Sequence, residues 1–189
     1  YEVIWGQPED VLKKMNIEAP KPILLPVFIL ERDGQAAAVT DSTPLIREFE
    51  EKYPDRSVLP KDPALNFINF ILEDFGDEWC TKFMFHYRWY FDEDADNAGT
   101  ILPLGINSNL KDDELAFFKE HFAKRQIDRL WVVGSNNDTA EFIDKSYKNV
   151  LSIFEDHFKN HPFLLGNLPS SCDFAVYGQF TQLVGFDPT

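Results

Sequence analysis

Residues 23–46, which read ILLPVFILERDGQAAAVTDSTPLI, decide the fold of the first part of the chain. The apolar run at 27–30 predicts a buried strand, and Asp33-Gly34 is a turn signal that leads into a returning strand at 36–40. The next residues predict a helix that ends near Lys52, because Asp, Ser and Thr favour helix starts and Pro is tolerated in the first turn. We therefore expect a hairpin that leads directly into a helix.

Leu25-Pro26 stands at the start of the first predicted strand, a position at which a cis peptide bond can occur. A cis bond would turn the backbone N–H and C=O of Leu25 outward, where they could pair with an extended, peptide-like ligand. The alternative is an ordinary trans proline that ends a loop, and this is the commoner state of such bonds.

Asp41-Ser42 stands where the second strand turns into the helix. A helix N-terminus offers free N–H groups and a positive partial charge, so it can hold a carboxylate. Ser42 adds a hydroxyl donor and Asp41 could pair with an ammonium, which together suit the two charged ends of an α-amino acid. The alternative is plain N-capping, which is the commonest use of Asp and Ser before a helix.

Outward from this stretch, the spacing of apolar residues divides the chain into three parts. These are an α/β part at 1–53, a proline-rich linker at 54–62 and an all-helical part at 63–189. The further elements that we expect are a strand at 1–5, helices at 8–15, 63–91, 112–130, 138–159 and 170–184, and a long polar loop at 92–111. The predicted class is α+β rather than a doubly wound sheet, because strands and helices do not alternate.

The last predicted helix begins with a sequence typical of a capping box. Ser170 and Asp173 have the S-x-x-D spacing, with Asp in place of the usual Glu. We interpret this pair as structural: it starts and fixes a buried helix and does no chemistry.

Composition excludes several classes of function. The 189 residues carry a formal net charge of -14, which disfavours binding to nucleic acid or to anionic lipid. No apolar run approaches the roughly 20 residues that a membrane span needs. Cys80 and Cys172 form neither a disulfide framework nor a zinc pattern, so we expect them to be packed in the core of a cytoplasmic protein. His157 and His161 have helical metal-ligand spacing but no third ligand in a known pattern, and we predict no metal.

In this order and spacing, the Leu25-Pro26, Asp41-Ser42 and Ser170–Asp173 motifs resemble the glutathione S-transferase superfamily. The resemblance implies a thioredoxin-like N-terminal domain that carries a cis-proline, followed by an all-helical C-terminal domain. It also implies that the cysteinyl backbone of glutathione pairs with Leu25, and that the γ-glutamyl group lies at Ser42 and Asp41.

The glycyl carboxylate of glutathione would, by the same resemblance, meet a basic residue near the helix at 8–15. Lys13, Lys14 and Lys21 are the candidates, and the sequence does not choose between them. The acceptor pocket of the family would be lined by the aromatic face of Phe83, Tyr87 and Tyr90. The alternative for these three side chains is core packing or dimer contact.

The resemblance further implies a homodimer that directs the thiolate of glutathione at a small hydrophobic electrophile or a disulfide. In the family, the thiol-activating residue lies in a first strand and helix that precede the segment matching 1–5. We therefore expect the N-terminus to be trimmed, and we can assign no catalytic residue. The end at Thr189 also looks early for the family. One alternative is a non-catalytic binding or scaffold protein of the same fold. Another is an unrelated helical protein with a small α/β cap.

Overall fold

A computed structural model describes all residues from Tyr1 to Thr189, and they divide into two units, Tyr1–Ser57 and Val58–Thr189. The chain is 62% helical with one two-stranded antiparallel sheet, which is compatible with the α+β class. None of the helices combines the length and the hydropathy that are needed to cross a membrane.

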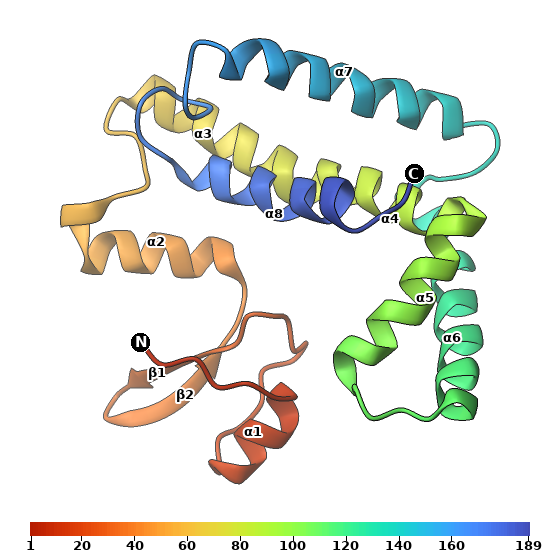
Figure 1. The fold of residues 1–189 in the computed structure, drawn as a ribbon. Coiled ribbons are helices and arrows are strands. Elements are labelled where there is room, and N and C mark those ends of the chain that lie inside the picture. Colours follow the sequence, from red (N-terminus) through yellow and green to blue (C-terminus); the bar gives the residue numbers. More distant parts are fainter. The chain divides into compact units, whose positions relative to one another are not determined.

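The first unit is built around the predicted hairpin (Figure 1). Its elements are α1 (Pro8–Lys14), β1 (Phe28–Arg32), β2 (Gln35–Val39), α2 (Ser42–Lys52) and a 3-10 turn (Pro54–Arg56). The strand register pairs Phe28 with Val39 and Arg32 with Gln35. Both turn residues have positive φ, 53° at Asp33 and 77° at Gly34, as the favoured two-residue hairpin turn requires.

The strand predicted at residues 1–5 is wrong, because this segment has no regular secondary structure. The sheet contains only β1 and β2, so the segment pairs with neither strand. Tyr1 and Trp5 are almost fully exposed. An alternating apolar sequence makes a strand only where a neighbour accepts its backbone hydrogen bonds and covers one face.

The second unit is helical, and each helix that was predicted in it begins close to its predicted position. They are α3 (Pro63–Asp74), a π-helical turn (Phe75–Cys80), α4 (Thr81–Tyr90), α5 (Asp92–Ile106), α6 (Asp112–Ile127), a 3-10 turn (Leu130–Val133), α7 (Ala140–Phe158) and α8 (Ser171–Gly185). The single helix predicted at 63–91 is therefore continuous in the backbone but carries a π-helical turn in its middle.

The core of the second unit forms where α8 lies along this long helix (Figure 1). Gly76 permits the close approach: a Cβ at this position would lie 2.8 Å from the backbone nitrogen of Val176. Beside it, Cys80, Phe83 and Tyr147 are buried in one cluster, with the Phe83 and Tyr147 ring centroids 5.7 Å apart.

The loop predicted at 92–111 is wrong for most of its length, because α5 spans Asp92–Ile106. The sequence of α5 is polar and contains Gly and Pro, but it also carries a stripe of small residues that packs on α6. The two helices lie side by side (Figure 1). Ala98 is fully buried, and a Cβ on Gly99 would lie 3.2 Å from the side chain of Lys119. Tertiary packing of this stripe outweighs the weak helix propensity of the sequence.

The predicted capping box at the start of α8 is confirmed. The backbone N–H of Ser170 donates to Asp173 Oδ2 at 2.9 Å, and the N–H of Leu164 donates to Oδ1 at 2.8 Å. Next to the box, Asn69 of α3 donates to Ser171 Oγ at 2.7 Å and accepts from the Cys172 N–H at 3.1 Å. The beginning of α8 is thus hydrogen-bonded to α3 inside the protein.

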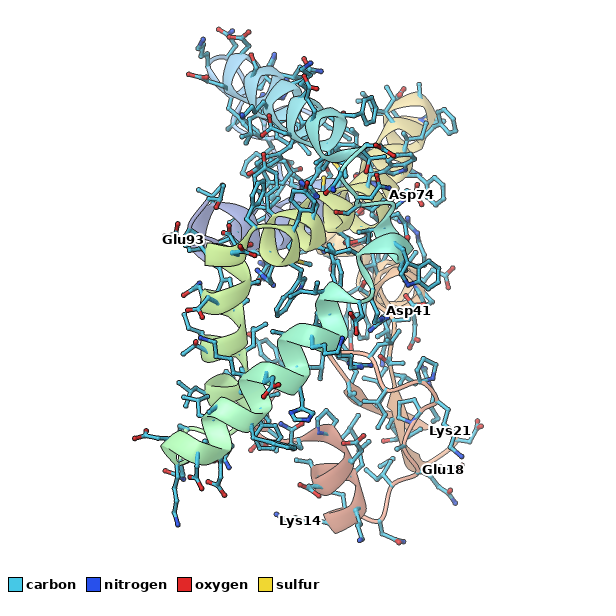
Figure 2. All side chains as sticks on the ribbon, turned by 90° about the vertical axis from the view of Figure 1, so that its right-hand side faces the viewer. Lys14, Glu18, Lys21, Asp41, Asp74 and Glu93 are labelled. Atoms are coloured by element: carbon cyan, nitrogen blue, oxygen red, sulfur yellow. The ribbon has the colours of Figure 1, made fainter.

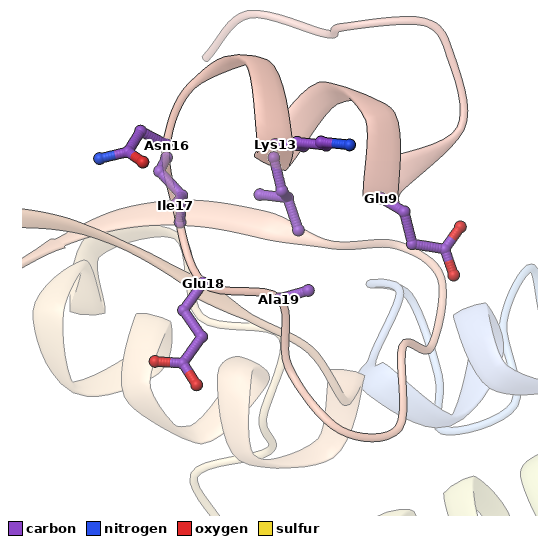
Figure 3. Close-up of a pocket in the computed structure, with 7 residues that line it drawn as sticks. Glu9, Lys13, Asn16, Ile17, Glu18 and Ala19 are labelled. Carbon is purple, nitrogen blue, oxygen red and sulfur yellow. The ribbon is translucent and has the colours of Figure 1, made fainter.

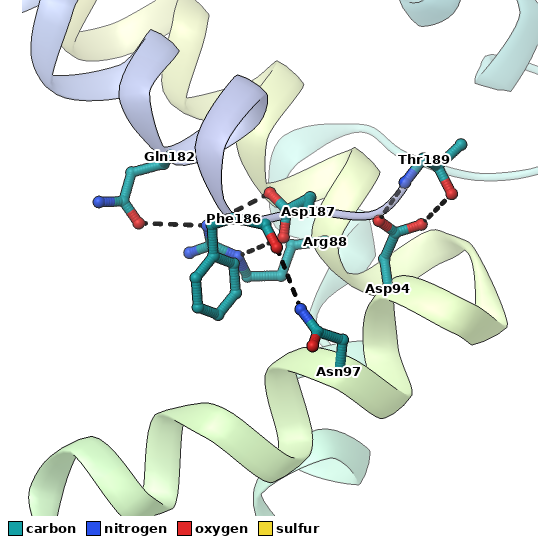
Figure 4. Close-up of polar contacts among 7 residues, drawn as sticks. All are labelled: Arg88, Asp94, Asn97, Gln182, Phe186, Asp187 and Thr189. Atoms are coloured by element: carbon teal, nitrogen blue, oxygen red, sulfur yellow. Dashed lines mark hydrogen bonds and ion pairs between the residues drawn. The ribbon is translucent and has the colours of Figure 1, made fainter.

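A second buried polar cluster joins the end of the chain to α4 and α5 (Figure 4). The Arg88 Nε donates to Asp187 Oδ1 at 2.9 Å, and both side chains are almost completely buried. Asn97 donates to the Phe186 carbonyl at 3.0 Å, while buried Asp94 accepts from the Thr189 N–H at 2.9 Å. Residues 186–189 are therefore held against the junction of α4 and α5.

Candidate functional site

The two motifs of the first unit lie side by side. The hydroxyl of Thr40 donates to the Leu24 carbonyl at 2.5 Å, which joins the segment before β1 to the residue before Asp41. The Leu25–Pro26 peptide bond is cis. Leu25, Asp41 and Ser42 are all exposed, so the structure brings together the backbone of one motif and the side chains of the other on an open surface.

The N-terminus of α2 has an unusual backbone. Asp41 has φ 77° and ψ 113°, a backbone conformation that residues other than Gly rarely adopt. Its Oδ1 accepts from the Thr43 N–H at 3.2 Å, which is a capping bond. The capping alternative is therefore present in the structure, and it is compatible with ligand binding because it engages only one acceptor of the carboxylate.

A pocket of about 450 Å³ lies at the C-terminal end of α1 (Figure 3). The residues that line it are Glu9, Leu12, Lys13, Asn16, Ile17, Glu18 and Ala19. Of the three candidate lysines, only Lys13 lines this pocket. Figure 2 shows Lys14 well separated from Asp41, at another part of the unit. The structure thus distinguishes Lys13 from the other two lysines by its place at a cavity.

The predicted aromatic face of Phe83, Tyr87 and Tyr90 is divided between two environments. Phe83 belongs to the core, where it packs on Tyr147 and is 7% exposed. Tyr87 belongs to the same core cluster and is 6% exposed, and together with Tyr90 it also lines a pocket of about 420 Å³ within the helical unit. The other residues that line this pocket are Phe91, Ala140, Glu141, Asp144, Lys148 and Thr189.

Asp144 is the polar centre of this second pocket. Its Oδ1 accepts from the Tyr87 hydroxyl at 2.6 Å, and its Oδ2 accepts from Lys148 Nζ at 2.9 Å. The Lys148 hydrogen bond, followed by the Tyr87 hydrogen bond, lowers the pKa of the Asp144 carboxyl below its ordinary value. Burial, together with the bond to Asp144, raises the pKa of the Tyr87 phenol. Asp144 is therefore the anion of the pair and Tyr87 the neutral donor.

A buried histidine lies behind the same aromatic residues, and the sequence analysis did not single it out. His86 Nδ1 is 2.7 Å from Ser135 Oγ, whereas its Nε2 has no hydrogen-bond partner. The ring stacks on Tyr90 with centroids 4.7 Å apart. Burial lowers the pKa of His86 below its ordinary value, so the ring is neutral at pH 7. Only its position at the centre of an aromatic run on a helix could have indicated burial.

The cysteines and the spaced histidines have structural surroundings. Cys80 and Cys172 are fully buried and unpaired, and burial raises the pKa of Cys80 to about 12. His157 and His161 stack on each other, with His157 Nε2 3.0 Å from the Phe163 carbonyl oxygen. No group of three or more His, Cys, Asp or Glu side chains is arranged to hold a metal ion.

The chain matches no family model, no curated protein and no solved structure. The functional assignment therefore depends on the residues and their geometry.

Proposed function

We propose that this chain is a glutathione S-transferase-like protein whose first unit, thioredoxin-like in fold, binds glutathione. The observation that carries the proposal is the Thr40–Leu24 hydrogen bond, since it places exposed Leu25 beside exposed Asp41 and Ser42. The order of α1, the β1–β2 hairpin and α2, followed by a helical unit, supports the same assignment.

Each part of glutathione finds a group of matching chemistry. The backbone N–H and C=O of Leu25 pair with the cysteinyl peptide as a neighbouring strand would. The Ser42 hydroxyl and the first N–H groups of α2 bind the γ-glutamyl carboxylate, and Asp41 binds its ammonium. Lys13 is the candidate for the glycyl carboxylate, because it lines the pocket at the end of α1 and the other two lysines do not. These local charges offset the repulsion between an anionic tripeptide and a chain of charge -14.

The chemistry that we propose is attack by the bound thiolate. The thiol of glutathione loses its proton, and its sulfur forms a bond to an electrophilic carbon or to one sulfur of a disulfide while the leaving group departs with the electron pair of the broken bond. Positioning of the two reactants supplies the rate enhancement. Tyr87 and Tyr90 are the candidates for contact with a small hydrophobic acceptor, and the thiol-activating residue is not assigned.

A glutathione titration of the wild-type chain and of Ser42→Ala tests the site by calorimetry. Loss of one charge-assisted hydrogen bond weakens binding by about ten-fold or more. Ser152→Ala, an exposed serine on α7, is the matched control and leaves the affinity unchanged. If wild type fails to bind glutathione, the proposed function is wrong; if it binds and Ser42→Ala binds equally well, the site assignment is wrong.

The second candidate function is a non-catalytic binding or scaffold protein of the same fold. An assay with a chromogenic electrophile separates the two candidates. Retention on immobilised glutathione with conjugation supports the transferase, and retention without conjugation supports the binding protein. The cytoplasm, where glutathione is kept reduced, is the setting that we propose for either function.

We also propose that two copies of the chain associate. On α3, Phe67, Phe70 and Ile71 are each about half exposed or more, and they lie at helical spacing. Light scattering after size exclusion chromatography tests this: the wild type elutes as a dimer, and Phe67→Ser shifts the mass toward the monomer. A monomeric wild type at all concentrations contradicts it.

A further inference from the structure

The pocket between the end of α4 and the beginning of α7 has one wall of aromatic rings and one of carboxylates. Tyr87, Tyr90 and Phe91 supply the rings, and Glu141 and Asp144 supply the carboxylates. Its volume of about 420 Å³ lies within the range of small-molecule pockets. An ionised carboxylate attracts a cation, and aromatic faces attract both a cation and an apolar body. A cation that has an apolar body therefore suits both walls.

The pocket already holds an ammonium. Lys148 Nζ lies 2.9 Å from Asp144 Oδ2, so a primary ammonium fits at this carboxylate. The Lys148 side chain is 68% exposed, and the pair is an i, i+4 contact on a helix surface. Such pairs contribute little to stability, so the lysine can leave the carboxylate at small cost. The Tyr87 hydroxyl, in contrast, is donated from a buried side chain and stays in place.

We propose that this pocket binds a small organic cation, a primary amine with an aromatic or apolar body, whose ammonium displaces Lys148 from Asp144. The body of the ligand lies against Tyr90 and Phe91. This goes beyond the proposed function by naming a ligand class for the second pocket, and it shares with that function only the residues Tyr87 and Tyr90. Binding itself needs no glutathione.

The test is a calorimetric titration of the full chain, without glutathione, with phenethylamine at low salt. Phenethyl alcohol and hydrocinnamate are the neutral and anionic comparison ligands. The expected result is that the amine binds and that the alcohol and the anion bind at least about ten-fold more weakly, because each lacks the charged hydrogen bond to Asp144.

Two variants of the pocket change the affinity for the amine in opposite directions. Asp144→Asn keeps an oxygen that accepts from Tyr87 but loses the charge, and it weakens amine binding by about ten-fold. Lys148→Ala removes the competing ammonium, and it strengthens binding by up to about five-fold. The matched controls are Asp156→Asn and Lys159→Ala. In the wild type, Lys159 Nζ lies 2.7 Å from Asp156 Oδ1 in a comparable exposed pair at the far end of α7. Neither control should change the affinity for the amine.

Several outcomes would overturn the proposal: no binding of the amine by wild type or Lys148→Ala, equal binding of the alcohol, or equal losses in Asp144→Asn and Asp156→Asn. If Asp144→Asn does not fold, the exposed Lys148→Ala and Lys159→Ala pair still decides, since only the first should tighten binding. The glutathione titration is separate, so each proposal can fail while the other stands.

Discussion

The starts of α2 and α8 use the same residue types in opposite surroundings. Asp41 and Ser42 open α2 on an exposed surface, and Asp41 makes one local capping bond. Ser170 and Asp173 open α8 in the interior, where the Asp173 carboxylate accepts from two backbone N–H groups and Ser170 is 5% exposed. A helix start whose polar groups are satisfied internally stabilises the fold, whereas one that is left open can bind a ligand.

The largest effect that separates the two helix starts is the loss of the Asp173 carboxylate. Asp173→Ala leaves the N–H groups of Ser170 and Leu164 without their acceptor, which costs about 2–4 kcal/mol of unfolding free energy. Urea denaturation measures it. Asp41→Ala is the matched variant and costs only about 1 kcal/mol, since it removes one exposed cap. Equal losses in the two variants would contradict the distinction between them.

The next effect concerns the support of the α8 start by α3. Asn69 is fully buried and bonds both Ser171 and the Cys172 N–H. Asn69→Ala leaves these groups unsatisfied and lowers the unfolding free energy by about 2–3 kcal/mol. The midpoint of urea unfolding reports it. Exposed Asn66→Ala on the same helix serves as control, and it should leave the midpoint unchanged or raise it slightly, because Ala has the higher helix propensity. A similar fall in that variant would contradict the role of the buried hydrogen bonds.

A substitution that removes only the charge of Asp41 separates helix capping from the proposed glutathione binding. Asp41→Asn keeps a side-chain oxygen for the Thr43 N–H, and Asn tolerates positive φ, so the unfolding free energy changes by less than about 0.5 kcal/mol. Glutathione binding falls by about ten-fold, because the ammonium loses its ionised partner. Calorimetry and urea unfolding of the same sample compare the two quantities. An unchanged glutathione affinity would remove Asp41 from the site.

Mild acid should destabilise the second unit through its buried histidine, His86. The folded pKa of His86 is lowered by burial from its usual 6.5, so the unfolded chain binds the proton first. The contribution of His86 to stability is therefore complete above pH 6.5 and is lost as the pH falls below it. Unfolding measured across pH 5 to 8 should show this slope, and His86→Phe should flatten it. An identical slope in the variant would assign it elsewhere.

Local sequence was sufficient for the elements whose signals are short-range. The hairpin follows from Asp33-Gly34 between two apolar runs, and the capping box follows from the spacing of Ser170 and Asp173. The proximity of Leu25 to Asp41 and Ser42 also follows, because a hairpin returns the chain to its starting point. These parts of the candidate site were predictable because few residues separate their members.

The parts that could not be predicted depend on partners that are distant in the sequence. The helix α5 forms because Ala98 and Gly99 fit against α6, a contact that its own polar sequence does not reveal. The second pocket joins Tyr87 to Asp144, 57 residues later. His86 of α4 was missed for the same reason, since its partner Ser135 follows the 3-10 turn at Leu130–Val133, 49 residues later.

The π-helical turn at Phe75–Cys80 lies where Gly76 permits the close approach of α8. The buried positions of the long helix keep one order through this turn, with Asn69 and Glu73 before it and Phe83 and Tyr87 after it. Phe67 and Phe70 lie off this buried side and stay exposed. One side of a single rod thus changes from polar groups in α3 to aromatic rings in α4 without leaving the interior, so the same helix is a hydrogen-bonding partner of α8 at one end and a wall of the apolar core at the other.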